Sequence, residues 1–348
     1  MLTRLPSQTH EEVWRVEDAA SGLRGFIALH STVRGPAAGG LRMRPYASDE
    51  EALRDALDLS RGMSYKNAAA SLPLGGGKAV IIGDPARDKS EALLRAMGRA
   101  VDALQGRYWT AEDMGMTPAD MAVIARETRY VAGRDEGRHP SGDPSPVTAR
   151  GVFEAMQIGA ARALGSADLA GRRVAVQGLG HVGWHLCRHL HTAGARLIVA
   201  DTDRARAEIA AREFAAVIAA PETVHAEPAD IFAPCAIGGI LNARTIPQIR
   251  ARLIAGAANN QLATPEDADR LHARGILYLP DYVANAGGII NAATEILGIE
   301  DRDAWVAQKL AELRATMERI LQRAAAENVS PAHLADRIVE ERMLARTG

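Results

Sequence analysis

Cysteine, long apolar runs and an excess of either charge are what this sequence lacks. Its 348 residues include only two cysteines, which excludes a disulfide framework and a four-cysteine zinc site and is typical of a reducing compartment. No stretch approaches the ~18 uninterrupted apolar residues of a membrane helix. A net charge of -2 gives no general attraction to nucleic acid or to anionic membranes. We therefore expect neither nucleic acid nor a membrane as a partner.

Candidate metal ligands and targeting signals are equally sparse. His189 and His191 lie near Cys187, but their spacing matches no common zinc pattern, so no metal site is expected. The first twenty residues carry acids early and lack the apolar core of roughly 7–15 residues that a secretory signal needs. The expected location is the cytoplasm.

The length of the sequence suggests two domains, since a typical domain has about 150 residues. Helical patterns alternate with short β-like runs, which predicts an α/β fold. Residues 134–148 gather three prolines and two glycines without apolar periodicity. This composition predicts the boundary between the domains.

Local signals predict several elements of the N-terminal half. A capping box at 48–51 begins a helix that should end near Gly62. Further helices are expected at about 90–104 and from Thr117 onward, with a short strand at 108–110 between them. Residues 79–82 are apolar and β-branched and are followed by Gly-Asp-Pro, so they form another expected strand.

Residues 172–201 carry the most informative motif. An apolar run at 174–176 precedes GLGHVG at 178–183, and a helix-like stretch leads to a second apolar run that ends in Asp201. Strand, GxGxxG, helix and a later acid together form the dinucleotide fingerprint of a Rossmann domain.

Each part of this fingerprint has a physical task. We expect Gly178 to permit the tight turn, Gly180 to let a pyrophosphate approach the helix N-terminus, and Gly183 to allow close packing of helix on strand. Asp201 is expected to accept hydrogen bonds from the ribose hydroxyls. Its charge favours NAD over NADP, although Arg204 and Arg206 nearby keep NADP as an alternative.

Three later β-like runs, at 230–236, 252–261 and 276–288, contain or end in small and amide residues. Ligands of a doubly wound sheet bind at the carboxyl ends of its strands. Asn259 and Asn285 are therefore candidates to contact the nicotinamide, and the alternative is that they only form turns.

The segment PLGGGKAVIIGDP at 73–85 is not a phosphate-binding loop. The residue after Lys78 is alanine rather than serine or threonine, and a strand rather than a helix follows. Lys66 lies in a similar apolar setting, and Asp113 follows the strand at 108–110. Because lysine is rarely buried without a partner, both lysines call for an anion or a catalytic purpose.

Taken together, eight segments resemble the Glu/Leu/Phe/Val family of amino-acid dehydrogenases, and leucine and phenylalanine dehydrogenases most. The likeness extends from about residue 24 to the C-terminus with the motifs in order. The segments are GPAAGGLRMRPY, GMSYKNAAASLPLGGGKAVIIGDP, GRYWTAEDMG, SGDPSPVTARGVFEAM, VQGLGHVG, IFAPCAIGG, AGAANNQL and PDYVANAGGIIN.

The resemblance implies reversible, NAD-dependent oxidative deamination of an L-amino acid to a 2-oxo acid and ammonia. Lys66 would bind the substrate carboxylate, Lys78 would be the catalytic lysine, and Asp113 would exchange protons with the amino group. The chemistry agrees, because a lysine acts as a base near neutrality only if desolvation or a nearby cation lowers its pKa. The glycines before Lys78 are expected to bring backbone close to the small substrate.

The resemblance also implies the remaining site residues. Gly39 and Gly40 would complete the substrate carboxylate contacts, together with Asn259. The expected cofactor-binding set is Gly178, Gly180, His181, Val182, Gly183, Asp201, Thr148, Cys235, Ala236, Ala257, Asn259 and Asn285.

The expected side-chain pocket is apolar, which disfavours a charged substrate such as glutamate. Ala111 favours a branched aliphatic substrate of the leucine type. The small residues at other positions leave room for an aromatic side chain, which is the alternative. The pocket residues are Ala38, Leu41 or Met63, Ala111, Ile289 and Ala292.

The expected architecture is an N-terminal α/β substrate and oligomerisation domain over residues 1–140 and a doubly wound, Rossmann-like NAD domain over 146–327, with a cleft between them. The tail, at about 328–348, is expected to pack back on the first domain, and the resemblance implies a homo-oligomer. Two other functions remain open: a 2-hydroxy-acid dehydrogenase and a non-catalytic NAD-binding protein.

Overall fold

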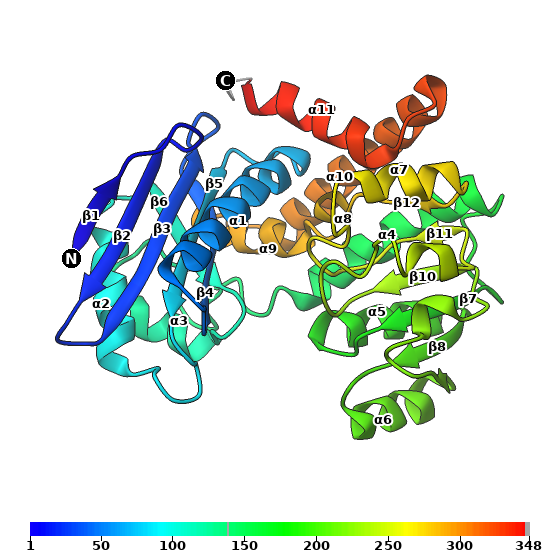
Figure 1. Ribbon diagram of the computed structural model, residues 1–348, viewed down its shortest axis with the longest axis horizontal. Coiled ribbons are helices and arrows are strands. Elements are labelled where there is room, and N and C mark those ends of the chain that lie inside the picture. Colours follow the sequence, from blue (N-terminus) through cyan, green and yellow to red (C-terminus); the bar gives the residue numbers. More distant parts are fainter. Residues whose placement is uncertain (138, 345–348) are drawn as a thin grey trace. The chain divides into compact units, whose positions relative to one another are not determined.

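The computed structural model describes residues 1–137 and 139–344. This chain divides into two compact units, whose elements are labelled in Figure 1. The first unit comprises Met1–Pro144, Ile289–Lys309 and the segment that starts at Val339, and the second comprises Ser145–Gly288 and Leu310–Ile338. Among the described residues, no helix has both the length and the apolar character that crossing a membrane requires.

A six-stranded mixed sheet forms the centre of the first unit, in the order β1-β2-β3-β5-β4-β6. β4 runs parallel to both β5 and β6, and its register places Gly40 beside Ala111 of β6 and Leu41 beside Ala79 of β5. This register brings the middle of β5 and the carboxyl end of β6 to either side of β4. The strands are β1 (Leu2–Leu5), β2 (Glu12–Asp18), β3 (Leu23–Ser31), β4 (Ala37–Arg44), β5 (Gly75–Ile82) and β6 (Tyr108–Glu112).

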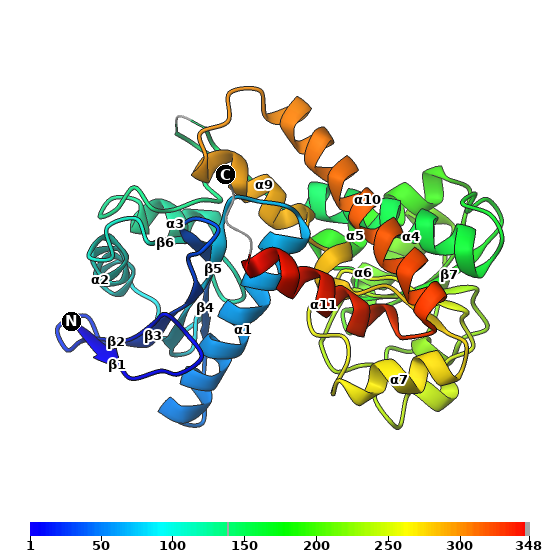
Figure 2. The same ribbon diagram turned by 90° about the horizontal axis from the view of Figure 1, so that it is seen from above.

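Helices cover both faces of this sheet. Val80 packs with residues of α1 (Asp49–Ala69), whereas Ala79 and Ile81 belong to a larger core with α2 (Glu91–Asp102) and α3 (Pro118–Ile124). Figure 2 shows α1 and α2 on opposite sides of the strands. Side chains alternate along a strand, so Lys78 lies on the same face as Val80, toward α1.

Helix α1 is longer than the sequence signals predicted. It begins where expected, with the Ser48 side chain accepting a hydrogen bond from the Glu51 backbone N–H at 3.2 Å. It does not end near Gly62 but continues to Ala69. Glycine within a helix costs about 1 kcal/mol, and the buried residues of the last two turns, such as Tyr65 and Asn67, offset that cost. The extension places Lys66 on this helix.

The second unit is built on a six-stranded parallel sheet in the order β12-β11-β10-β7-β8-β9. This is the doubly wound order, and the direction of winding changes between β7 and β10. The strands are β7 (Arg173–Gln177), β8 (Arg196–Ala200), β9 (Val217–Ile218), β10 (Ile231–Pro234), β11 (Leu253–Ile254) and β12 (Leu277–Tyr278). The helices are α4 (Ser145–Ala163), α5 (His181–Thr192), α6 (Arg204–Phe214), α7 (Glu266–Ala273) and α8 (Asp281–Ala284), joined by residues 310–338 of α10 (Arg302–Glu327) and α11 (Pro331–Leu344).

Two segments differ from the expected division of the chain. Residues 289–309, which include most of α9 (Gly287–Ile296), were expected in the second domain but lie in the first unit. The reason is Glu295, whose buried carboxylate accepts hydrogen bonds from the backbone N–H groups of Gly133 at 2.9 Å and Ser141 at 3.2 Å. These contacts fasten α9 to the loop that ends the first unit.

The C-terminal tail also differs from the expectation. Residues 328–338 belong to the second unit, and the first unit takes only the segment from Val339 onward. There the Tyr65 hydroxyl donates to Glu340 at 2.5 Å, and Arg342 donates to the Ala69 carbonyl at 3.2 Å. The last expected tail residues, 345–348, lie outside the described residues.

Candidate active site

Lys78 on β5 and Asp113, which follows β6, form an ion pair. The Lys78 Nζ lies 2.6 Å from the Asp113 Oδ2, and the lysine side chain is only 6% exposed. A buried ammonium without a partner would be costly, so the carboxylate stabilises its position. The same Asp113 oxygen accepts a hydrogen bond from the Arg42 Nε at 2.9 Å. Two cationic groups therefore meet on one carboxylate oxygen.

Burial and charge together set the protonation states of this pair. Burial lowers the pKa of Lys78, the Asp113 carboxylate opposes that shift, and Arg42 adds to it. Burial alone would raise the pKa of Asp113, but the charges of Lys78 and Arg42 outweigh burial and hold it at about 2. Asp113 is thus ionised at neutral pH, and the lowered pKa of Lys78 brings that amine nearer to the range in which a base is useful.

The other predicted substrate residues of the first unit are spread over four elements. Lys66 lies in the last turn of α1 and is partly buried. Gly39, whose carbonyl accepts the Tyr108 hydroxyl at 2.9 Å, lies on β4. Ile289 and Ala292 are one turn apart on α9 and are buried. The remaining members, Ala38 and Gly40 on β4 and Ala111 on β6, are buried or partly buried.

The three glycines before Lys78 have a packing role that the sequence did not predict. A Cβ on Gly76 would lie 2.2 Å from both the backbone N and the Oγ of Ser64 in α1. A Cβ on Gly75 would lie 1.9 Å from the Ser31 carbonyl oxygen, and one on Gly77 would lie 2.7 Å from the Tyr108 ring. The glycines therefore allow close packing of β5 within the first unit, against β3, α1 and β6, and their approach to a substrate stays a prediction.

In the second unit the fingerprint glycines have the predicted geometry. Gly178 has a φ of 95°, which a glycine adopts without strain, and follows β7. A Cβ on Gly183 would lie 2.1 Å from the Gly178 carbonyl oxygen, so α5 packs closely on this turn. A Cβ on Gly180 would meet no atom within 4 Å. The backbone at Gly180, which is the N-cap of α5, is thus open to a ligand.

Asp201 directly follows β8 and organises the turn. Its Oδ2 accepts the Leu179 backbone N–H at 2.7 Å, and its Oδ1 accepts the Asp203 backbone N–H at 2.8 Å. The Arg206 Nη1 lies 3.9 Å from the same carboxylate. An ionised carboxylate accepts about four hydrogen bonds, so each oxygen retains accepting capacity.

The two amide candidates are in direct contact. Asn285, which ends α8, donates from its Nδ2 to the Asn259 Oδ1 at 2.9 Å and to the Ala257 carbonyl at 3.0 Å. The Oδ1 of Asn285 is buried and has no hydrogen-bond partner in the described part of the chain. A buried acceptor without a partner is costly, which makes it a candidate contact for a ligand donor.

The other cofactor candidates lie around the change of winding direction. Cys235 and Ala236 follow β10, and a Cβ on Gly178 would lie 2.7 Å from the Ala236 Cβ. His181 and Val182 begin α5, and Thr148 is buried in the first turn of α4. Within the described residues, no group of three or more His, Cys, Asp or Glu side chains could hold a metal ion.

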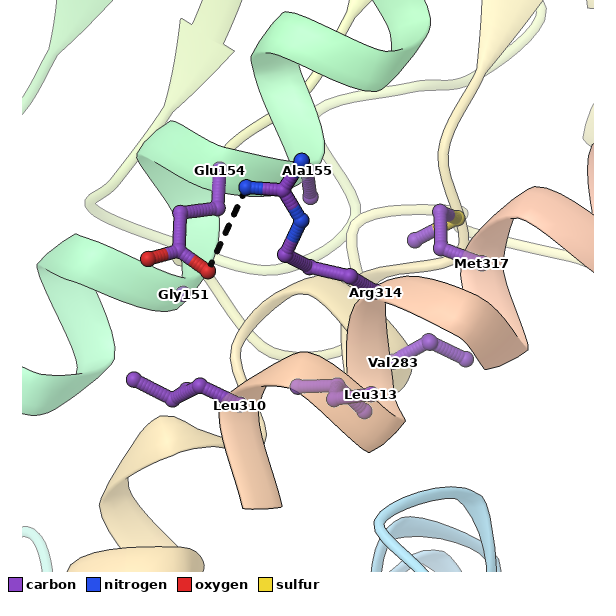
Figure 3. A pocket seen from close by; sticks show the side chains of 8 residues that line it. All are labelled: Gly151, Glu154, Ala155, Val283, Leu310, Leu313, Arg314 and Met317. Carbon is purple, nitrogen blue, oxygen red and sulfur yellow. Dashed lines mark ion pairs between the residues drawn. The ribbon is translucent and has the colours of Figure 1, made fainter. Parts of the chain in front are cut away.

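A separate pocket of the second unit contains none of the predicted site residues. Figure 3 shows it between α4, α8 and α10, with the Arg314 Nη1 3.9 Å from the Glu154 Oε2. Leu310, Leu313 and Met317 supply its apolar lining. Its lining is apolar apart from this ion pair, and neither Lys78 nor Asp113 belongs to it.

Sequence reasoning missed Arg42. The structure places it within β4, a largely buried strand where an arginine needs a carboxylate partner. Its partner could not be chosen from the sequence, since that choice depends on the register between β4 and β6.

Family models match most of the chain. Residues 8–130 match the dimerisation domain of the Glu/Leu/Phe/Val dehydrogenases. Residues 141–206 and 199–341 match the glutamate/leucine/phenylalanine/valine dehydrogenase model.

Individual proteins are similar over nearly the whole length. A leucine dehydrogenase of Geobacillus stearothermophilus is 51% identical over 334 residues, which cover 96% of this chain and 90% of that protein. A valine dehydrogenase of Streptomyces albus is 48% identical, with 96% and 92% covered. The crystal structure of an L-tryptophan dehydrogenase from Nostoc punctiforme is 43% identical, has a TM-score of 0.81 and covers 96% of each chain. The chain therefore belongs to the Glu/Leu/Phe/Val dehydrogenase family of amino-acid dehydrogenases.

Proposed function

We propose that this protein catalyses the reversible, NAD-dependent oxidative deamination of an apolar L-amino acid to the 2-oxo acid and ammonia, with leucine-type branched substrates preferred. The observation that carries the proposal is the buried Lys78–Asp113 pair, 2.6 Å apart, in a chain 51% identical to a leucine dehydrogenase. The pair supplies an amine with a lowered pKa and an ionised carboxylate side by side.

In this proposal, different residues of the first unit bind the substrate and transfer protons. The Lys66 ammonium binds the substrate carboxylate through a charge-assisted contact. A bound NAD would supply the acceptor for the hydride that leaves Cα. Lys78 takes a proton from the water that adds to the resulting imine carbon, and Asp113 exchanges protons with the substrate nitrogen.

Three features of the second unit fit a dinucleotide. The open backbone at Gly180 and the N-terminus of α5 suit a pyrophosphate. Asp201 has accepting capacity for the ribose hydroxyls, and its charge opposes a 2′-phosphate, so NAD rather than NADP is proposed. The Asn285 Oδ1, which has no partner among the described residues, suits the amide N–H of a nicotinamide.

The substrate preference rests on the pocket residues and on the relatives. Ala38, Ala111, Ile289 and Ala292 are apolar, and an unpaired charge among them would be costly. The leucine and valine dehydrogenases at 51% and 48% identity support a branched side chain.

An aromatic substrate is the second candidate. The tryptophan dehydrogenase structure, at 43% identity, supports it, as do the small side chains at Ala38 and Ala292. Pocket size discriminates between substrates by only about 1–3 kcal/mol per methylene, so activity on both classes of amino acid is compatible with these pocket residues.

A substrate panel tests the function. NADH formation is measured at saturating NAD across leucine, valine, isoleucine, phenylalanine, tryptophan and glutamate, with NADP in parallel. We expect turnover to be fastest on a branched substrate and to require ammonia in reverse. Fastest turnover on phenylalanine or tryptophan would establish the second candidate. No turnover by folded protein that binds NAD would refute both.

Self-association is part of the proposal. The family model that matches residues 8–130 is described as a dimerisation domain, and we extend that property to this chain as a homo-oligomer. Light scattering after gel filtration measures its mass, and a monomer of 37.1 kDa would contradict the proposal.

A further inference from the structure

Arg42 connects the Lys78–Asp113 pair to a second acid, Asp55. From β4, its Nε donates to the Asp113 Oδ2 at 2.9 Å while its Nη1 donates to the Asp55 Oδ2 at 3.2 Å. The side chains are largely buried, with 14% of Arg42, 19% of Asp55 and 22% of Asp113 exposed. One guanidinium therefore bridges a carboxylate of α1 and the carboxylate that binds Lys78.

Asp55 is itself held in place by two residues, Tyr46 and Arg44. The Tyr46 hydroxyl donates to its Oδ2 at 2.7 Å, and the Arg44 Nε lies 3.8 Å from the same oxygen. The Arg44 guanidinium also stacks 4.0 Å from the centre of the Tyr46 ring. These contacts hold the Asp55 carboxylate in place. Because the donors of a guanidinium have a rigid planar geometry, the position of Asp55 determines how Arg42 is oriented toward Asp113.

We propose that Arg42, oriented by Asp55, is a positioning residue that holds the Asp113 carboxylate against Lys78 and that Asp55 moderates the effect of its charge on Lys78. This deepens the proposed function and rests on it. Its Nε and Nη1 donate to the two carboxylates, so in this proposal Arg42 acts through Asp113.

The arrangement implies that replacing Arg42 and replacing Asp55 shift the pKa of Lys78 in opposite directions. The charged groups that act on Lys78 are Arg42 on β4, Asp55 on α1 and Asp113 after β6. The charge of Arg42 lowers the pKa of Lys78, after the larger effects of burial and Asp113, and the charge of Asp55 raises it. Removing Arg42 should therefore move the titration of Lys78 to higher pH, and neutralising Asp55 should move it to lower pH.

The test compares Arg42→Gln, Arg42→Lys and Asp55→Asn with the wild-type protein. We measure kcat and KM for leucine and the acid limb of kcat/KM in deamination, together with NADH binding and Tm. Arg42→Gln should lower kcat on the order of tenfold or more and shift the acid limb up by about half a pH unit or more. Arg42→Lys should restore part of kcat, and Asp55→Asn should shift the limb down.

Arg15→Gln is the matched control. Arg15 lies on β2 of the same sheet and pairs with Asp49 of the same helix at 2.7 Å. Its guanidinium donates to Asp49 and Glu17 instead of Asp113 or Asp55, so its loss should leave the acid limb unchanged even if Tm falls.

Wild-type kcat and an unmoved limb in Arg42→Gln would overturn the inference. So would shifts of the same sign in Arg42→Gln and Asp55→Asn, or a loss of activity that only tracks Tm. These outcomes arise with an active wild-type protein and leave the proposed function intact. A wild-type protein that turns over no amino acid overturns the function and the inference together.

Discussion

At the scale of single residues, the proposed chemistry depends on how burial and charge act on one amine, Lys78, and one carboxylate, Asp113. Lys78 is almost fully buried and lies 2.6 Å from Asp113. Burial favours the neutral amine and the carboxylate favours the ammonium, so their balance determines when Lys78 gives up its proton. Removing either side chain should lower kcat more than it weakens binding of the cofactor.

Replacing Lys78 with alanine tests this separation. Since general base catalysis contributes about 10²- to 10⁴-fold, we expect Lys78→Ala to lower kcat by a factor in that range. NADH binding, measured by fluorescence, should stay near wild type. Lys66→Ala is the contrasting variant, because loss of a substrate contact should mainly raise KM for the amino acid. A Lys78→Ala protein with normal kcat would remove the lysine from the mechanism.

Asp113 predicts a pH dependence of stability. Its pKa is about 2 in the folded chain, below the ordinary 3.8, so the unfolded chain takes up the proton first as pH falls. The stabilisation is present above pH 4 and is lost toward pH 2, with about 1 kcal/mol lost between pH 5 and pH 3. Urea unfolding at both pH values should show a smaller loss for Asp113→Asn than for wild type.

The control for this measurement is Asp303→Asn, whose side chain is 97% exposed. It should keep the wild-type pH dependence. An Asp113→Asn protein whose free energy of unfolding falls as steeply as that of wild type would show that another group is responsible.

At the scale of elements, the sequence determined where strands and helices begin better than what they pack against. The cap at Ser48 and the fingerprint at 178–183 were readable because short-range chemistry specifies them. The packing role of Gly76 was not readable, since it depends on how closely α1 lies on β5. Arg42 was not predicted as a site residue for the same reason, because its partners come from two other elements.

The contact between α1 and β5 predicts a pair of opposite stability changes. Gly76→Ala would place a Cβ 2.2 Å from Ser64 and 2.5 Å from the Ser60 carbonyl oxygen. We expect it to lower the free energy of unfolding by about 1–3 kcal/mol or more. Gly62→Ala, in the same helix but with no atom within 4 Å of the new Cβ, should raise it by about 0.5–1 kcal/mol. Equal effects in chemical denaturation would contradict the proposed packing role.

At the scale of the whole molecule, one buried carboxylate joins distant parts of the sequence. Glu295 accepts hydrogen bonds from residues 154 and 162 positions earlier, Ser141 and Gly133, and its side chain is 1% exposed. It also pairs with Arg134 at 2.5 Å. The sequence indicated a boundary near residue 140 but contained no local sign that the chain returns to the first unit at residue 289, because a long-range contact leaves no periodic pattern.

Glu295→Ala should therefore be among the most destabilising substitutions of the first unit. It leaves buried donors and an arginine without their acceptor, which costs about 3–5 kcal/mol for a buried pair. Glu300→Ala, where the side chain is 82% exposed, is the control and should change stability little. Urea unfolding of both variants measures the difference, and a mild effect of Glu295→Ala would show that other contacts hold α9.

The first unit is assembled from three separate stretches of chain, which limits how it can be exchanged by genetic recombination. A single genetic crossover near codon 144 between this gene and a diverged relative would replace the loop at 133–141 but keep the native α9. Such a chimera would set a foreign loop against Glu295, and the hydrogen bonds would survive only if the loop were compatible. Exchange of the whole first unit requires three pieces of DNA to be transferred together, so the two units are expected to be exchanged less easily than a two-part architecture suggests.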